Sequence, residues 1–116
     1  MDNQKAVRLL GALAQETRLA TFRLLVQTGS DGLSVGQIAE QLGVPSPTLS
    51  FHLKELVHAG LVKTQQQSRF VFCTANFGEM NALLAYLTES CCAGEPCGAA
   101  TFAANACPPG ELKAAL

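Results

Sequence analysis

The stretch that decides the fold runs from Leu33 to Gly60 and reads LSVGQIAEQLGVPSPTLSFHLKELVHAG. Its first half predicts a short helix, because Ser34 can cap the helix start and Gln37, three residues later, completes a capping box. Apolar residues recur at helical spacing from Val35 and stop at Gly43, a residue typical of helix ends. This half therefore predicts a helix followed by a tight turn.

The second half predicts another helix, with one apolar and one polar face. We expect Ser46 to cap its start and Pro47 to lie in its first turn, where a missing N–H costs nothing. Small polar residues gather at the N-terminal end of this helix. Two short helices joined by a turn of this kind are typical of a helix-turn-helix that reads DNA. The predicted apolar face consists of Leu49, Leu53, Leu56 and Val57.

Two β-prone runs, 61–67 and 69–74, follow this element and meet at Gln67-Ser68. This pattern predicts a β-hairpin. A hairpin directly after a helix-turn-helix is a wing. We therefore predict a mainly α fold with a small β-hairpin, a winged helix-turn-helix.

Three further helices are expected around this element. A first helix over 3–14 and a second over about 16–28 precede it, and Asn76 with Glu79 predicts a capped last helix. The other helices already close the domain, so the apolar stripe on the last helix needs a partner. We therefore assign the first and last helices to a homodimer interface. Inward-facing residues are expected to be Val7, Leu10, Leu13, Leu19, Phe22, Leu25 and Val26, and the stripe consists of Met80, Leu83, Leu84 and Leu87.

A family resemblance extends over roughly residues 5–92. Residues 38–62, IAEQLGVPSPTLSFHLKELVHAGLV, and residues 13–19, LAQETRL, resemble the ArsR/SmtB family of metal-sensing bacterial repressors. The resemblance implies a homodimeric winged-helix repressor. Such a protein binds double-stranded operator DNA and releases it when a metal or metalloid binds.

Composition and charge agree with this expectation. The 116 residues form one domain with a modest core and contain no apolar run long enough to span a membrane. The N-terminal stretch carries acids and is not expected to be a signal peptide, so we expect a cytoplasmic protein with reduced thiols. The net charge is −1, yet residues 45–75 carry Lys54, Lys63 and Arg69 against Glu55 alone. The positive charge therefore lies on the second helix and the wing, where DNA phosphates would be met.

The candidate DNA-binding residues belong to that second helix and to the wing. His52 is either a DNA contact or a polar group that stabilises the helix, and these two alternatives stay open. Arg69 at the wing tip is the candidate for a phosphate or minor-groove contact. The full set is Ser46, Pro47, Thr48, Ser50, His52, Lys54, Gln67 and Arg69.

A second chemical cluster lies in residues 91–116, predicted to be a flexible tail that follows a DNA-binding and dimerisation domain over 1–90. Four of the five cysteines fall within seventeen residues there. The Gly-Glu-Pro turn would fold Cys97 back toward the adjacent pair Cys91 and Cys92. Three soft thiolates suit As(III) or Sb(III), whereas zinc prefers four ligands, the fourth of which Cys107 could supply. Cys73, in the second wing strand, is interpreted as a packing residue.

The resemblance also bears on this metalloid site. The best-known arsenic repressors carry Cys-x-Cys where this chain has Ser34-Val35-Gly36, and the family's zinc sensors use Asp and His on a last helix that here lacks both. Residues 91–97 instead resemble members whose arsenite site is a vicinal cysteine pair plus a third cysteine past the last helix. Cadmium, lead or zinc sensing and thiol-redox or iron–sulfur control remain alternatives. An enzyme is not expected, because no Cys-x-x-Cys motif or phosphate-binding loop is present.

Overall fold

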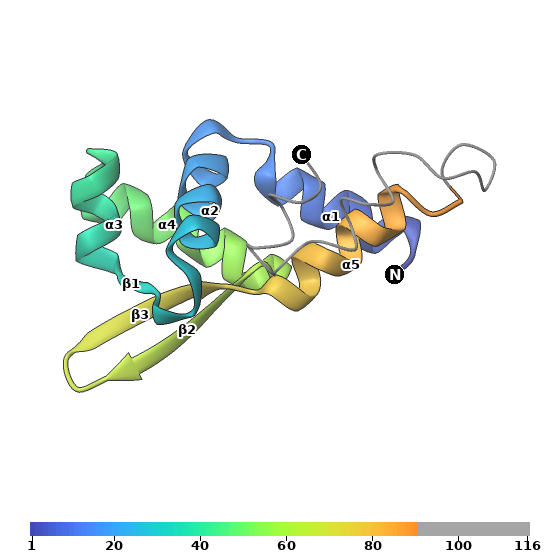
Figure 1. The fold of residues 1–116 in the computed structure, drawn as a ribbon. Coiled ribbons are helices and arrows are strands. Elements are labelled where there is room, and N and C mark those ends of the chain that lie inside the picture. Colours follow the sequence, from blue (N-terminus) through green and yellow to red (C-terminus); the bar gives the residue numbers. More distant parts are fainter. Residues whose placement is uncertain (91–116) are drawn as a thin grey trace, which may run out of the picture.

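The computed structural model describes residues 1–90. The predicted tail 91–116, with its cysteines, and the predicted boundary between the two segments lie outside the described residues. Figure 1 shows five helices and a long hairpin that projects away from them. The elements are α1 (Asn3–Leu13), α2 (Glu16–Thr28), the 3₁₀ turn η1 (Gly29–Asp31), β1 (Leu33–Ser34), α3 (Val35–Leu42), α4 (Ser46–Ala59), β2 (Val62–Gln67), β3 (Phe70–Ala75) and α5 (Phe77–Leu87).

The fold is the predicted winged helix-turn-helix, with one strand more than expected. Strands β2 and β3 form the hairpin, and β1 adds to the other edge of β3, giving the order β1-β3-β2 with antiparallel pairing throughout. The strand β1 is only two residues long, too short for a periodic pattern to reveal it. It ties the start of α3 to the wing, since Leu33 pairs with Cys73 and Ser34 with Phe72.

One core joins all the helices to the base of the wing. It contains side chains from every helix and from β2 and β3, so the wing is not an independent hairpin. Burial of these apolar groups drives the association of the elements. The large side chains that are fully buried are Leu9, Leu25, Ile38, Leu49, Leu56, Leu61, Thr21 and Cys73.

The helix ends confirm most of the predicted caps. The Ser34 hydroxyl accepts a hydrogen bond from the backbone N–H of Gln37, and the Gln37 side-chain oxygen accepts one from the backbone N–H of Ser34. The helix α3 ends at Gly43, which has φ +66°. The prediction that Ser46 caps α4 is wrong. Ser46 is already helical, and Pro45 holds the cap position without a side-chain hydrogen bond, while Pro47 does lie in the first turn.

The cap of α5 is confirmed, but its capping box is not. The Asn76 side chain accepts a hydrogen bond from the Glu79 N–H (3.3 Å) and donates one to the Gly60 carbonyl (2.9 Å). The Glu79 carboxylate does not return to the cap. It pairs instead with the Lys5 ammonium of α1 at 3.2 Å, which links the two helices that were assigned to a dimer interface.

Several residues predicted to face inward are exposed within the protomer. On α1, Ala6 and Leu9 enter the core, whereas 62% of Val7 and 42% of Leu10 are exposed. The face of a short helix that is buried depends on which neighbour it packs against, and that neighbour is distant in sequence. The other exceptions to the predicted inward faces are Leu19, which lines a groove between α2 and α5, and Val57. Of the stripe on α5 that was expected to be exposed, Leu87 is exposed but Leu83 is buried in the core of the protomer.

Candidate nucleic-acid interface

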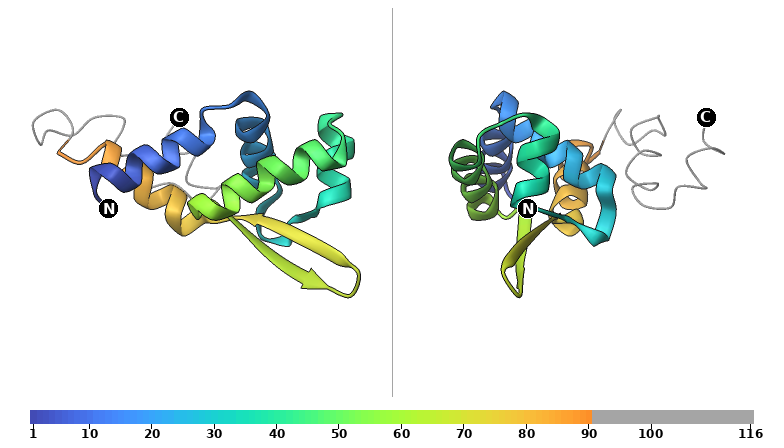
Figure 2. Two further views of the ribbon diagram at one scale, coloured as in Figure 1. Left: turned by 180° about the vertical axis from the view of Figure 1, so that it is seen from behind. Right: turned by 90° about the vertical axis from the view of Figure 1, so that its left-hand side faces the viewer.

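The helix α4 separates its apolar and polar residues by direction. Leu49, Leu53 and Leu56 are buried, and they anchor α4 against α1, α2 and α3. The residues at its start remain exposed on the opposite side. Figure 2 shows α4 crossing the molecule, with its start beside α3 and its end near α5. The exposed predicted residues on this helix are Ser46, Pro47, Thr48, Ser50 and Lys54.

His52 differs from the other predicted DNA contacts because it is half-buried. Its Nδ1 atom is buried and has no hydrogen-bond partner among the described residues. Its ring meets the ring of Phe51 edge-on, with the centroids 5.4 Å apart. His52 therefore lies at the edge between the core-facing side and the exposed side of α4.

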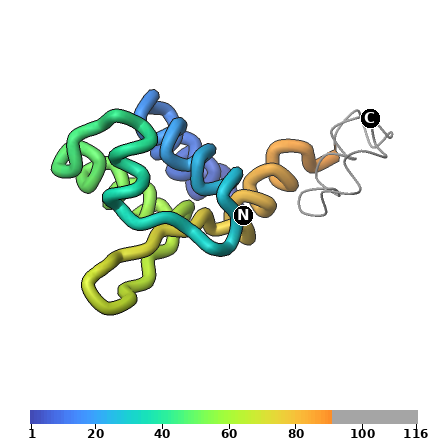
Figure 3. The backbone as a smooth tube through the Cα atoms, turned by 60° about the vertical axis from the view of Figure 1, so that its left-hand side comes forward, coloured from blue at the N-terminus to red at the C-terminus, as the bar shows by residue number. Residues whose placement is uncertain are grey.

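The wing presents Gln67 and Arg69 at its tip. Gln67 pairs with Phe70 as the last pair of the ladder, so Ser68 and Arg69 form a two-residue turn, and Ser68 takes a positive φ of 56°. Both Gln67 and Arg69 are exposed. In Figure 3 this turn lies at the end of the hairpin farthest from α5.

The middle of α4 and one face of the wing border a common cleft. Ser50, Lys54 and Val57 of α4 lie across from Thr64 and Val71 of the wing, around a volume of about 230 Å³. Of the predicted DNA contacts, Ser50 and Lys54 line this cleft, whereas Gln67 lines a hollow on the other face of the wing. Cys73 lies on the floor of the cleft and is fully buried.

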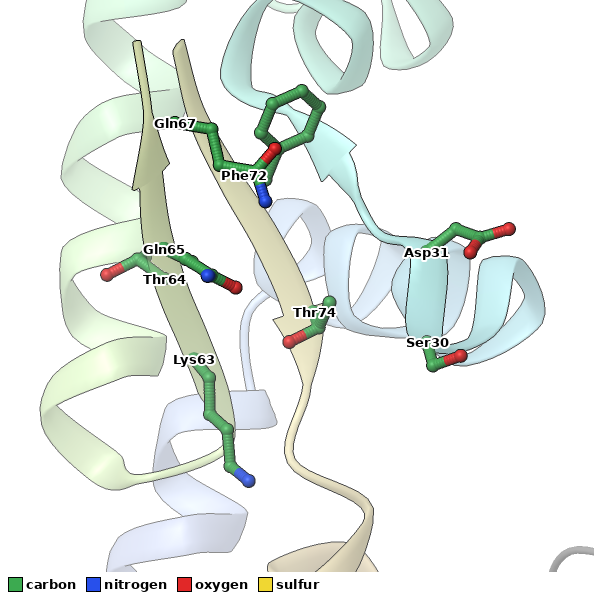
Figure 4. Close-up of a pocket in the computed structure, with 8 residues that line it drawn as sticks. All are labelled: Ser30, Asp31, Lys63, Thr64, Gln65, Gln67, Phe72 and Thr74. Carbon is green, nitrogen blue, oxygen red and sulfur yellow. The ribbon is translucent and has the colours of Figure 1, made fainter.

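Lys63 lies on the opposite face of the wing. Alternate residues of a strand point to opposite sides, and Lys63 lines a polar hollow of about 500 Å³ that faces η1 rather than α4. Figure 4 shows this hollow, with Asp31 and Ser30 across from the strands. The basic residues of segment 45–75 therefore lie on two faces of the molecule: Lys54 borders the cleft next to α4, and Lys63 lies on the other face of the wing.

The charges of Lys54 and Arg69 favour an anionic partner. Among residues 1–90 the ion pair found is that of Lys5 with Glu79, so neither Lys54 nor Arg69 has an acidic partner within that part of the chain. Exposed basic side chains without acidic partners are suited to contact the phosphates of a duplex.

The predicted metalloid ligands Cys91, Cys92 and Cys97 lie outside the described residues. Within residues 1–90 no group of three or more His, Cys, Asp or Glu side chains is placed to hold a metal ion. The helix α5 ends at Leu87, four residues before Cys91. Within the same range no helix is long and apolar enough to cross a membrane.

Two exposed aromatic residues of this surface were not among the predicted contacts. Phe51 on α4 is 57% exposed, and Phe70 at the start of β3 is 58% exposed. A sequence signal for Phe51 existed, because it lies opposite the apolar face of the helix. Hydrogen-bonding patterns alone do not indicate such a residue, because an aromatic ring contacts DNA through its apolar surface.

Comparisons with known proteins agree with this geometry. A family model described as a helix-turn-helix domain matches residues 13–65. The transcriptional activator HlyU of Vibrio cholerae is 35% identical over 91 residues, which cover 78% of this chain and 82% of HlyU. The uncharacterized HTH-type transcriptional regulator YceK of Bacillus subtilis is 38% identical over 68 residues, covering 59% of this chain and 67% of YceK.

Solved structures of other transcriptional regulators have the same fold as this chain. HlyU from Vibrio cholerae matches with a TM-score of 0.63, covering 79% of this chain and 99% of HlyU, and a second structure of that protein is described as reduced HlyU. The homodimeric winged helix-turn-helix DNA-binding domain of Mb0332 from Mycobacterium bovis, described as a possible ArsR-family regulator, is 26% identical with a TM-score of 0.60. It covers 75% of this chain and 81% of that chain. The proteins named here are transcriptional regulators rather than enzymes.

Proposed function

Because the chain belongs to the ArsR/HlyU type of winged helix-turn-helix transcriptional regulators, we propose that it is a metalloid-responsive repressor. In this proposal a homodimer binds operator DNA and releases it when As(III) or Sb(III) binds three cysteine thiolates. The observation that carries the DNA-binding part is the exposed polar side of α4, which borders the wing at Ser50 and Lys54, with Lys54 and Arg69 free of acidic partners among residues 1–90.

Exposed apolar side chains on α1 and α5 support the dimer in this proposal. Val7, Leu10 and Leu87 are 62%, 42% and 53% exposed, and the two helices that carry them are joined by the Lys5–Glu79 ion pair. Apolar residues gathered on adjoining helices favour a partner surface. A twofold dimer would place two α4 helices about one DNA turn apart, ~34 Å, on a pseudo-palindromic operator.

The metalloid site consists of Cys91, Cys92 and Cys97. Their support is chemical: thiolates are soft ligands, and three of them satisfy a trigonal As(III) or Sb(III) ion, while zinc would favour a fourth. The described residues offer no competing cluster, and Cys73 is buried in the core.

Coupling between the two sites would run through α5. Cys91 follows the end of α5 by four residues, and α5 packs on α1 at the surface proposed for the dimer. A ligand at this point can bias the relative orientation of two protomers and hence the spacing of their α4 helices. Couplings of this kind are typically about 1–3 kcal/mol.

The test is release of a fluorescent operator duplex, followed by anisotropy while reduced protein is titrated with arsenite, antimonite, cadmium or zinc. Release is expected with arsenite and antimonite in the wild type and in Cys107→Ser. The Cys97→Ser variant should bind DNA with unchanged affinity but no longer release it. Release of Cys97→Ser at the wild-type arsenite concentration would overturn the ligand assignment, and release by cadmium or zinc alone would indicate a four-ligand metal sensor.

A second candidate function is thiol-redox control on the same fold. It is favoured by the solved structure of the relative described as reduced HlyU, which is 36% identical to this chain. Release of the duplex by diamide in the absence of any metalloid, reversed by dithiothreitol, would support redox control. Release by arsenite under reducing conditions would support the metalloid proposal.

A further inference from the structure

The start of α4 carries an exposed aromatic ring that the core does not use. Phe51 is 57% exposed, whereas Leu49 and Leu53, on either side of it in sequence, are 0% and 5% exposed. Each residue of a helix is rotated by about 100° from the previous one, so Phe51 points about 200° away from Leu49. The ring therefore lies on the face opposite the core.

Phe51 has one apolar neighbour on the exposed side of α4, and polar side chains lie around it. Pro47, one turn earlier, is also exposed. The half-buried His52 ring meets the Phe51 ring edge-on, with a centroid distance of 5.4 Å and an interplanar angle of 66°. The hydroxyls of Thr48 and Ser50 are exposed on the same helical segment.

The position of this segment argues against a role in dimer formation. The start of α4 lies beside α3, at the other end of the helical body from the free end of α5 (Figure 2). The exposed apolar residues Val7 and Leu10 are on α1, which pairs with α5. Lys54, one turn after Phe51, is exposed and has no acidic partner within residues 1–90. Glu55, four residues after Phe51 and on the same side of the helix, is exposed as well. A partner at the Phe51 surface is therefore expected to offer charged and hydrogen-bonding groups as well as an apolar one.

The major groove of DNA meets both requirements. Its phosphates suit Lys54, its base edges suit hydroxyl groups, and the 5-methyl group of thymine is the apolar group that it exposes. We propose that Phe51 packs against a thymine methyl group in each operator half-site and so specifies an A·T pair there. This inference rests on the proposed DNA-binding function, and it names a specificity-determining residue within it.

The test uses a duplex that the wild-type protein selects from a random double-stranded library. Each thymine of the selected half-site is replaced in turn by deoxyuridine, which removes the methyl group and leaves the base pairing intact. At one position in each half-site, the wild type is expected to lose affinity about fourfold, since burial of one methyl group is worth about 0.8 kcal/mol. Phe51→Ala should bind thymine and deoxyuridine duplexes equally, and its own library selection should lose the thymine preference.

The control is Leu19→Ala, which truncates an apolar side chain of α2 that is 44% exposed and lies outside the cleft between α4 and the wing. It should keep the fourfold discrimination, and circular dichroism should show that both variants fold. Failure of the wild type to enrich any duplex would overturn the proposed function and this inference together. An enriched duplex that the wild type binds equally well with thymine or deoxyuridine at every position would overturn the inference alone, as would discrimination that persists in Phe51→Ala.

Discussion

Burial determines the chemistry of the Cys73 side chain. The thiol is fully buried in β3, with Leu33 as its neighbour on β1 and Thr64 as its neighbour on β2. Removal from water disfavours the charged thiolate, so burial raises the pKa of Cys73 above its ordinary value of 9.0. Since the thiolate is the reactive and metal-binding form, Cys73 is suited to packing rather than to ligand binding, which confirms the interpretation made from the sequence.

The expected outcome is slow reaction of Cys73 with a thiol reagent. In a variant that carries serine at the other four cysteines, Cys73 should react with dithiobis-nitrobenzoate only as fast as the protein unfolds, and at once in guanidinium chloride.

The raised pKa of Cys73 also predicts how the stability of the protein depends on pH. The free energy of unfolding should be constant below pH ~9 and fall as the pH rises further, because the unfolded thiol ionises first. A parallel titration of Cys73→Ala should lack this part of the fall.

Arg69 allows a second test at the level of the residue. If its guanidinium meets a phosphate, Arg69→Ala should weaken binding to all duplexes and reduce the slope of log Kobs against log salt concentration by about 0.9. The control is Arg23→Ala, which removes an exposed arginine that lines the groove between α2 and α5. An unchanged slope in Arg69→Ala would mean that Arg69 is only a solvated charge.

The two-residue strand β1 connects the helix-turn-helix to the wing. It holds the entry to α3 against β3, and the turn before it depends on Gly32, which has φ +73°. A Cβ atom at Gly32 would lie 2.6 Å from the Cys73 carbonyl oxygen and 2.7 Å from the Thr74 Cγ2 atom. The backbone of the wing and that of the helix-turn-helix are therefore in direct contact at this point.

This contact predicts that Gly32→Ala destabilises the fold by more than the roughly 1 kcal/mol typical of a left-handed glycine. The matched control is Gly29→Ala, which also has a positive φ of 86° but no atom within 4 Å of the added Cβ. The free energies of unfolding of the two variants, measured by urea denaturation, differ by the cost of the steric clash, because both variants carry the cost of a positive φ. Equal losses of stability would show that β1 can move away from β3 without penalty.

For the whole molecule, the decisive feature is the exposed apolar surface of α1 and α5. The protomer leaves Val7, Leu10 and Leu87 in contact with solvent although its own core is complete. A dimer through this surface would bury them, and an operator read by two α4 helices requires such a dimer.

We expect Leu10→Glu to produce a monomer, because a buried unpaired carboxylate costs several kcal/mol at an apolar interface. Sedimentation velocity should show the change in mass, and operator affinity should fall at least tenfold. Ala20→Glu places the same charge on an exposed position of α2 and should remain dimeric. A Leu10→Glu protein that stays dimeric would place the interface elsewhere.

Features that depend on neighbours along the chain can be predicted from the amino-acid sequence. The helix-turn-helix, the end of α3 at Gly43, the cap at Asn76 and the hairpin after α4 were all predicted within a few residues, because caps, turns and periodic patterns involve residues at most four or so apart. Of the eight candidate DNA contacts, seven are exposed as a contact requires, and His52 is half-buried.

Which helix and strand faces meet depends on the folded structure. On α1, Ala6 and Leu9 are buried in the core, whereas Val7 and Leu10 are exposed. The Glu79 carboxylate pairs with Lys5, which is more than seventy residues away in the chain. Lys63 lies on the face of the wing away from α4. Each outcome depends on a partner far along the chain, and the choice among helix faces of similar apolar content is made by packing, which no local pattern contains.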